Sequence, residues 1–112
     1  MSTSTAVVFA FPSREVLRAI RVLEGRRRGL EAELAASVLV KAMAAGDCVP
    51  PWTLTLLLST MLQSEGLFAL RLADSLSVFD DVLDILVVGQ QLVMSSKPHD
   101  RLLGLRLLRR LG

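Results

Sequence analysis

Apolar residues recur at helical spacing through most of this 112-residue chain. At about 100° per residue, one face of the segment 51–64 carries Leu54, Leu57, Leu58, Met61 and Leu62. Strands of a β-sheet would instead show strict alternation, and an antibody-like or jelly-roll fold would need more than 4% aromatic residues. The spacing therefore predicts an all-α fold.

Glycine, proline and capping residues divide this pattern into segments. Ser13 is placed to cap a helix over 14–24, and Gly25 and Gly29 then break the pattern. A single helix from 14 to 45 is the alternative. Ser77 and Asp80 resemble a capping box. The predicted helices are 14–24, 30–45, 51–64, 67–76, 78–94 and 98–111.

This division predicts five or six short amphipathic helices, arranged as a compact bundle or as a mini-solenoid of helical hairpins. We expect residues 13–112 to form a single all-α domain. Residues 1–12 are expected to be a flexible or partner-binding tail.

The chain is unusually apolar for its length, with 52% hydrophobic residues and 23 leucines. A domain of this size buries only about 65% of its unfolded surface, so some apolar surface is expected to stay exposed. The apolar arcs of 30–45, 78–94 and 98–111 are wider than one packing face needs. We therefore predict two-sided helices, with one side for the core and one for a partner.

Residues 69–76 can be aligned on residues 104–111 with an offset of 35, and four of the eight positions are identical. Each copy is the second helix of a predicted helix pair. Together with the stretch Gln63–Leu72, this period resembles the tetratricopeptide and pentatricopeptide hairpin repeats over about half of the chain. The resemblance implies a concave groove that takes a partner peptide or helix, and no catalysis.

The predicted function is that of a non-enzymatic interaction module, an adaptor or a small chaperone, which binds a partner's amphipathic helix or a second copy of itself. Residues 51–111 are expected to form the groove. Trp52 is either an interface anchor or a core plug. The candidate partner-binding residues are Phe9, Phe11, Trp52, Leu56, Leu102, Leu105 and Leu108.

Arginine makes up 11 of the 13 basic residues, although the net charge is only +2. The candidate basic surface consists of Arg14, Arg18, Arg21, Arg26, Arg27, Arg28, Arg106, Arg109 and Arg110. A solvated face, or a face that steers acidic partners, is the favoured interpretation. The alternative is a small basic nucleic-acid-binding regulator that uses Arg14–Arg28, but the chain has no Tyr and one Trp for base stacking. Association of the last helix with a membrane surface is less favoured.

Signatures of catalysis and of cofactor or metal binding are absent from the sequence, which has no Gly-x-Gly-x-x-Gly, Walker loop or His-Glu-x-x-His. We interpret His99 as an exposed neighbour of a helix cap and Cys48 as a small filler residue. Asp80, Asp81 and Asp84 fit a helix N-terminus better than a cation site. A single cysteine fits a reducing, cytoplasmic setting. No segment has the ~18 consecutive apolar residues of a membrane span.

Overall fold

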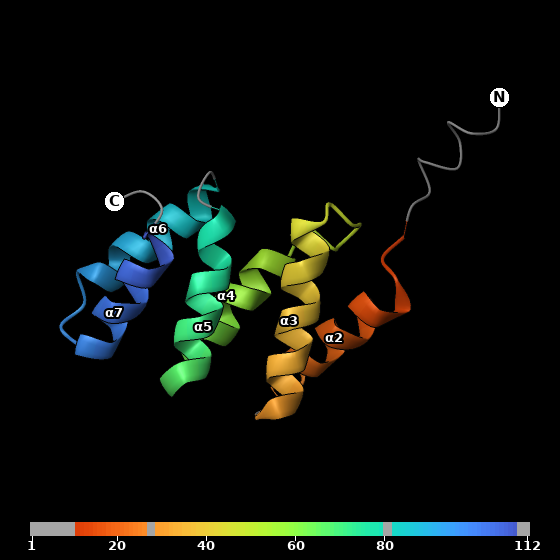
Figure 1. The fold of residues 1–112 in the computed structure, drawn as a ribbon, viewed down its shortest axis with the longest axis horizontal. Helices are drawn as coiled ribbons and strands as arrows, with labels where there is room; N and C mark the ends of the chain where they lie inside the picture. Colours follow the sequence, from red (N-terminus) through yellow and green to blue (C-terminus); the bar gives the residue numbers. More distant parts are fainter. Residues whose placement is uncertain (1–10, 27–28, 80–81, 110–112) are drawn as a thin grey trace. The chain divides into compact units, whose positions relative to one another are not determined.

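A computed structural model of the chain describes residues 11–26, 29–79 and 82–109 (Figure 1). All regular secondary structure in these residues is helical, so the predicted all-α fold is confirmed. The elements are α2 Arg14–Glu24, α3 Leu30–Ala44, α4 Thr53–Gln63, α5 Gly66–Leu76, the 3-10 turn η1 Ser77–Phe79, α6 Leu83–Val93 and α7 Pro98–Leu107.

The chain divides into two compact units, the first ending at Leu56 and the second beginning at Leu57. The boundary between the units lies inside α4. The expectation of a single domain over residues 13–112 stays a prediction. Each unit is described below by itself.

In the first unit, α2 and α3 are separate helices, as the glycines predicted, and not one helix from 14 to 45. The Ser13 hydroxyl caps α2 by accepting a hydrogen bond from the Val16 amide at 3.1 Å. In the turn after α2, Arg26 adopts the left-handed conformation with a φ of 56°, whereas Gly25 is in the right-handed helical conformation. Residues other than glycine adopt the left-handed conformation at a cost in free energy, so the backbone is strained at Arg26.

The helices α2 and α3 pack against each other, and most of the buried residues of α3 are alanines. The buried residues of α2 are Val16, Ala19, Ile20 and Leu23. Those of α3 are Ala32, Ala35, Ala36, Leu39 and Ala42. Because alanine side chains are small, the backbones of α2 and α3 can approach each other closely. The other residues of α3 contribute little to this core. At about 100° per residue, the sequence places Leu17 on the same apolar face as Val16, Ile20 and Leu23, but Leu17 is exposed beside the arginines of α2.

The helix α4 begins at Thr53, two residues later than the sequence suggested. Thr53 is buried, and its hydroxyl donates to the Pro50 carbonyl at 2.7 Å. This bond replaces the solvent contact that burial removes from the hydroxyl. Leu57, Leu58 and Met61 are buried as the helical spacing predicted, whereas Leu62 is exposed.

In the second unit, α7 packs against both α5 and α6. In the 35-residue alignment, Ala69 and Leu72 of α5 correspond to Gly104 and Leu107 of α7, and all four are buried. The burial differs at other aligned positions, since Ala73 is buried and Leu108 is half-buried. The predicted capping box at Ser77 is wrong. Ser77 ends α5, where its hydroxyl donates to the Asp74 carbonyl at 2.6 Å, and α6 begins only at Leu83.

Two glycines set the close contact between α6 and α7. A Cβ atom at Gly104 would lie 2.7 Å from the Val93 amide nitrogen and 2.8 Å from the Gly89 carbonyl oxygen. A Cβ at Gly89 would lie 2.5 Å from the side chain of Leu108. The α7 backbone therefore rests directly on the α6 backbone at Gly104, and Leu108 fills the space above Gly89.

Candidate interaction surface

Each of the three helices predicted to be two-sided carries exposed apolar side chains opposite its buried face. In α3 these are Leu30 and Leu34, which lie across the helix from the buried Leu39. α6 and α7 carry similar residues, described below. Exposed leucines scattered singly are ordinary on a protein surface, but repeated leucines on one helix face are characteristic of a contact surface.

The outer face of α7 consists of Leu102 and Leu105, with exposed fractions of 41% and 59%. Their neighbours Leu103 and Leu107 are 1% and 0% exposed, because they point toward the core of the second unit. Three exposed arginines surround the two leucines, namely Arg101, Arg106 and Arg109. This apolar pair within a ring of cations is called the α7 surface below.

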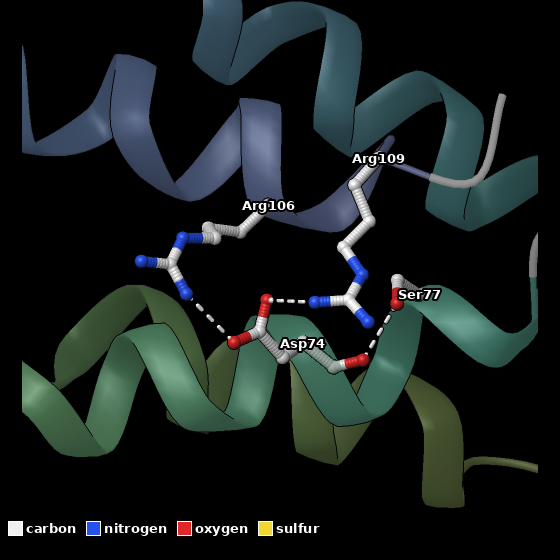
Figure 2. Close-up of polar contacts among 4 residues, drawn as sticks. All are labelled: Asp74, Ser77, Arg106 and Arg109. Carbon is white, nitrogen blue, oxygen red and sulfur yellow. Dashed lines mark hydrogen bonds and ion pairs between the residues drawn. The ribbon is translucent and has the colours of Figure 1, made fainter. Parts of the chain in front are cut away.

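Two of these arginines are held by one carboxylate of α5 (Figure 2). Asp74 accepts from Arg106 at 2.8 Å and from Arg109 at 3.4 Å, through different carboxylate oxygens. The side chains of Arg106 and Arg109 remain 44% and 60% exposed. The ion pairs therefore orient both arginines, and each contact with Asp74 engages only the Nη1 atom of a guanidinium that has five N–H donors.

The third arginine is fixed to the loop before α7. The Arg101 guanidinium donates to the carbonyls of Ser95 and Ser96, at 3.2 Å and 3.1 Å. Within the same loop, the Ser95 hydroxyl donates to the Asp100 carboxylate at 2.9 Å. All three arginines beside the exposed leucines are therefore held in place. This reduces the conformational entropy that their side chains lose when a partner binds.

The outer face of α6 carries an apolar stripe that the sequence analysis did not identify. Leu83, Val87 and Met94 are 70%, 43% and 86% exposed, and Gln90 lies in line between the last two. The spacing of four, three and four residues keeps the four side chains on one narrow face. These four residues are called the α6 stripe below. The sequence predicted a second apolar side for 78–94, but its spacing did not show which residues form that side.

The other candidate partner residues are placed as follows. Phe11 and Trp52 are exposed in the first unit, and Leu56, its last residue, is half-buried. Leu108 is half-buried against Gly89, so it contributes to the contact between α6 and α7. Phe9 lies outside the described residues.

The candidate basic residues of the first unit lie mostly on one face of α2. Arg14, Arg18 and Arg21 are exposed along this face, and Arg26 follows it in the turn. None of the four forms an ion pair with another described residue. Arg27, Arg28 and Arg110 lie outside the described residues.

The candidate reactive groups that the structure describes form no evident site. His99 is half-buried, not exposed as expected, and its Nε2 atom is buried without a hydrogen-bond partner in the described residues. Cys48 is exposed. Asp84 lies in the first turn of α6, and Asp80 and Asp81 lie outside the described residues. The described part of the chain contains no group of three His, Cys, Asp or Glu side chains that could hold a metal ion.

None of the described helices combines the length and the apolar character needed to cross a membrane.

No protein-family model matches the chain, and neither a curated protein nor a solved structure is significantly similar to it. The resemblance to tetratricopeptide hairpins therefore stays a prediction.

Proposed function

We propose that this chain is a non-enzymatic protein–protein interaction module, an adaptor or small chaperone of the cytoplasm. Its α7 surface binds an amphipathic helix of a partner that carries leucines on one face and carboxylates beside them. The observation that carries this proposal is the exposure of Leu102 and Leu105 between three anchored arginines, on the side of α7 that faces away from the core. An apolar face beside cations favours an apolar face beside anions.

The energetics of this surface favour a moderate affinity. Full burial of a leucine side chain contributes about 2 kcal/mol, and these two leucines are already about half-buried. Completing their burial therefore contributes about 2 kcal/mol in total. Association costs more than this, so charge-assisted hydrogen bonds from the arginines must supply the remainder.

A binding experiment tests the proposal with a synthetic peptide as the probe. The peptide is a fluorescently labelled helix with leucines along one face and glutamates on both sides, and fluorescence anisotropy measures its affinity for the full chain. Replacing both Leu102 and Leu105 by Gln is expected to weaken binding at least tenfold, which corresponds to about 1.4 kcal/mol. The matched control replaces Leu30 and Leu34 by Gln, two leucines of α3 that are 69% and 59% exposed.

The control variant is expected to bind the peptide like the unmodified chain. The proposal is refuted if the unmodified chain does not bind the peptide, or if the Leu102 and Leu105 variant binds it as tightly as the control does. Circular dichroism of both variants confirms that the helices are intact.

A basic nucleic-acid-binding regulator is the second candidate, supported by Arg14, Arg18 and Arg21, none of which forms an ion pair within the described part of the chain. Three phosphate contacts would make the affinity for duplex DNA fall steeply with salt concentration. Replacing Arg14 and Arg18 by Glu should then abolish binding at low salt. If the unmodified chain does not bind duplex DNA at low ionic strength, this candidate is eliminated.

A further inference from the structure

We infer that the α6 stripe is a self-association surface, on which a second copy of this chain packs its own α6 in the antiparallel direction. This inference rests on the proposed function only in so far as it treats the chain as an interaction module. It concerns α6, for which it proposes a second copy of the chain as the partner, and the α7 surface takes no part in the contact.

The geometry of the stripe suits a helix–helix contact. Leu83 and Met94 are eleven residues apart, which is about 16 Å or three turns along the helix axis. The stripe lies across α6 from Ile85 and Leu92, which face the core of the second unit. A second helix can therefore lie along the whole stripe without displacing α7.

Exposed charges of opposite sign lie near the two ends of α6, one in its first turn and one in the loop that follows the helix. Asp84 is exposed in the first turn of α6, and Lys97 is exposed three residues beyond Met94. Neither forms an ion pair with another described residue. The glutamines between them, Gln90 and Gln91, are neutral and exposed.

This polarity fixes the direction of pairing. Two antiparallel copies place each Asp84 carboxylate near the Lys97 ammonium of the other copy, whereas parallel copies would place like charges together. A twofold axis generates the ion pair twice, and twofold dimers are the commonest symmetric assemblies. Antiparallel alignment also opposes the two helix dipoles.

The apolar residues match in the same arrangement. If Leu83 of one copy lies against Met94 of the other, then Val87 lies against Gln90 of the other copy. The flexible Met94 side chain can adapt to the leucine that it meets. A membrane surface is a poor alternative occupant, because anionic lipids attract cationic residues and the first turn of this stripe carries a carboxylate.

Charge exchange in trans tests this inference on the full chain. Sedimentation velocity measures the dimer affinity of the unmodified chain, of Asp84→Lys and of Lys97→Glu. Each single variant is expected to dimerise about tenfold more weakly, because it faces two like-charge pairs. An equimolar mixture of the two variants restores opposite charges at both ends, and so does the double variant.

The expected result is therefore recovery of dimers in the mixture and in the double variant. Lys41→Glu, at an exposed lysine of α3 in the first unit, is the matched control and should dimerise normally. The inference is overturned if the unmodified chain is monomeric at all concentrations, or if the mixture dimerises no better than the single variants. If α6 bound a different protein in place of a second copy, the unmodified chain would be monomeric at all concentrations.

Disulfide trapping gives an independent readout of the register. In a background with Cys48→Ser, a Val87→Cys chain is mixed with a Gln90→Cys chain under mild oxidation. A mixed disulfide dimer is expected, and a Leu34→Cys chain should form no disulfide with either. Failure of the Val87 and Gln90 variants to cross-link contradicts the proposed register.

These experiments separate this inference from the proposed function. Loss of peptide binding with intact dimers contradicts only the α7 proposal. A monomeric chain that binds the peptide contradicts only the α6 inference.

Discussion

The contact between α6 and α7 predicts that Gly104→Ala destabilises the protein. A Cβ at Gly104 meets two backbone atoms, the Val93 nitrogen at 2.7 Å and the Gly89 oxygen at 2.8 Å. Ordinary contacts begin at 3.4 Å, so the helices would have to separate by about 0.7 Å. A gap of this size removes a quarter to a half of the dispersion energy of each contact that it opens.

The magnitude follows from two opposing effects. Overpacking costs about 3 kcal/mol where backbone atoms obstruct the new methyl group. Alanine is favoured over glycine inside a helix by about 1 kcal/mol, which partly offsets this cost. The free energy of unfolding should therefore fall by about 2 kcal/mol, which lowers the melting temperature by roughly 8–15 °C.

The matched control is Gly89→Ala, the other glycine in the interior of these helices. The three atoms nearest to its new methyl group all belong to the Leu108 side chain, which can change rotamer. The packing cost and the gain in helix propensity are then each about 1 kcal/mol, so the stability should change by less than about 0.5 kcal/mol.

Urea unfolding followed by far-UV circular dichroism measures both variants. The midpoint of Gly104→Ala should shift down while the slope stays constant, since the surface exposed on unfolding is unchanged. The reasoning fails if Gly104→Ala is as stable as the unmodified chain, or if Gly89→Ala loses as much stability.

Four smaller predictions concern single interactions, and the same urea unfolding measures each. Ser13→Ala removes the cap at the Val16 amide and should cost about 1 kcal/mol; Ser13→Gly should cost only a few tenths. Arg26→Gly should raise stability by about 1 kcal/mol, because glycine tolerates the positive φ; a decrease would show that the arginine side chain stabilises the turn. Thr53→Val should cost about 1 kcal/mol through loss of the buried hydroxyl's hydrogen bond, and no loss would mean that the bond contributes nothing net. Asp74→Ala should cost about 0.5–1 kcal/mol at low salt and less at high salt, because both of its arginine partners are largely exposed; an effect that salt does not reduce would contradict an ion-pair origin.

Most helix ends were predictable because their signals are local. Ser13 and the glycines at 25 and 29 act within one turn, and the structure divides α2 from α3 where they predicted. The error at Ser77 has a local cause as well. Serine can accept from the helix that follows or donate to the helix that precedes, and here it donates backward to Asp74.

The exposed surfaces were less predictable, because in a helix that is apolar on most sides the spacing does not fix which side faces the core. Leu102 and Leu103 are adjacent in sequence, but one is 41% exposed and the other 1%. Leu108 is equally apolar, and only its contact with Gly89 places it between the two helices. That contact joins residues of different helices, so periodicity within one helix cannot reveal it.

The glycines themselves carry the missing information about orientation. A glycine inside a leucine-rich helix is unfavourable unless a close neighbour requires it, so its side of the helix should face another backbone. At about 100° per residue, Leu102 and Leu105 point at least 100° away from Gly104, whereas Leu108 points within about 40° of it. In α6, the three apolar residues of the stripe all point about 120° or more away from Gly89. Orienting each helix by its glycine would therefore have placed Leu108 toward α6, and Leu102 and the α6 stripe outside. It would not have separated the exposed Leu105 from the buried Leu103, because both point about 100° away from Gly104.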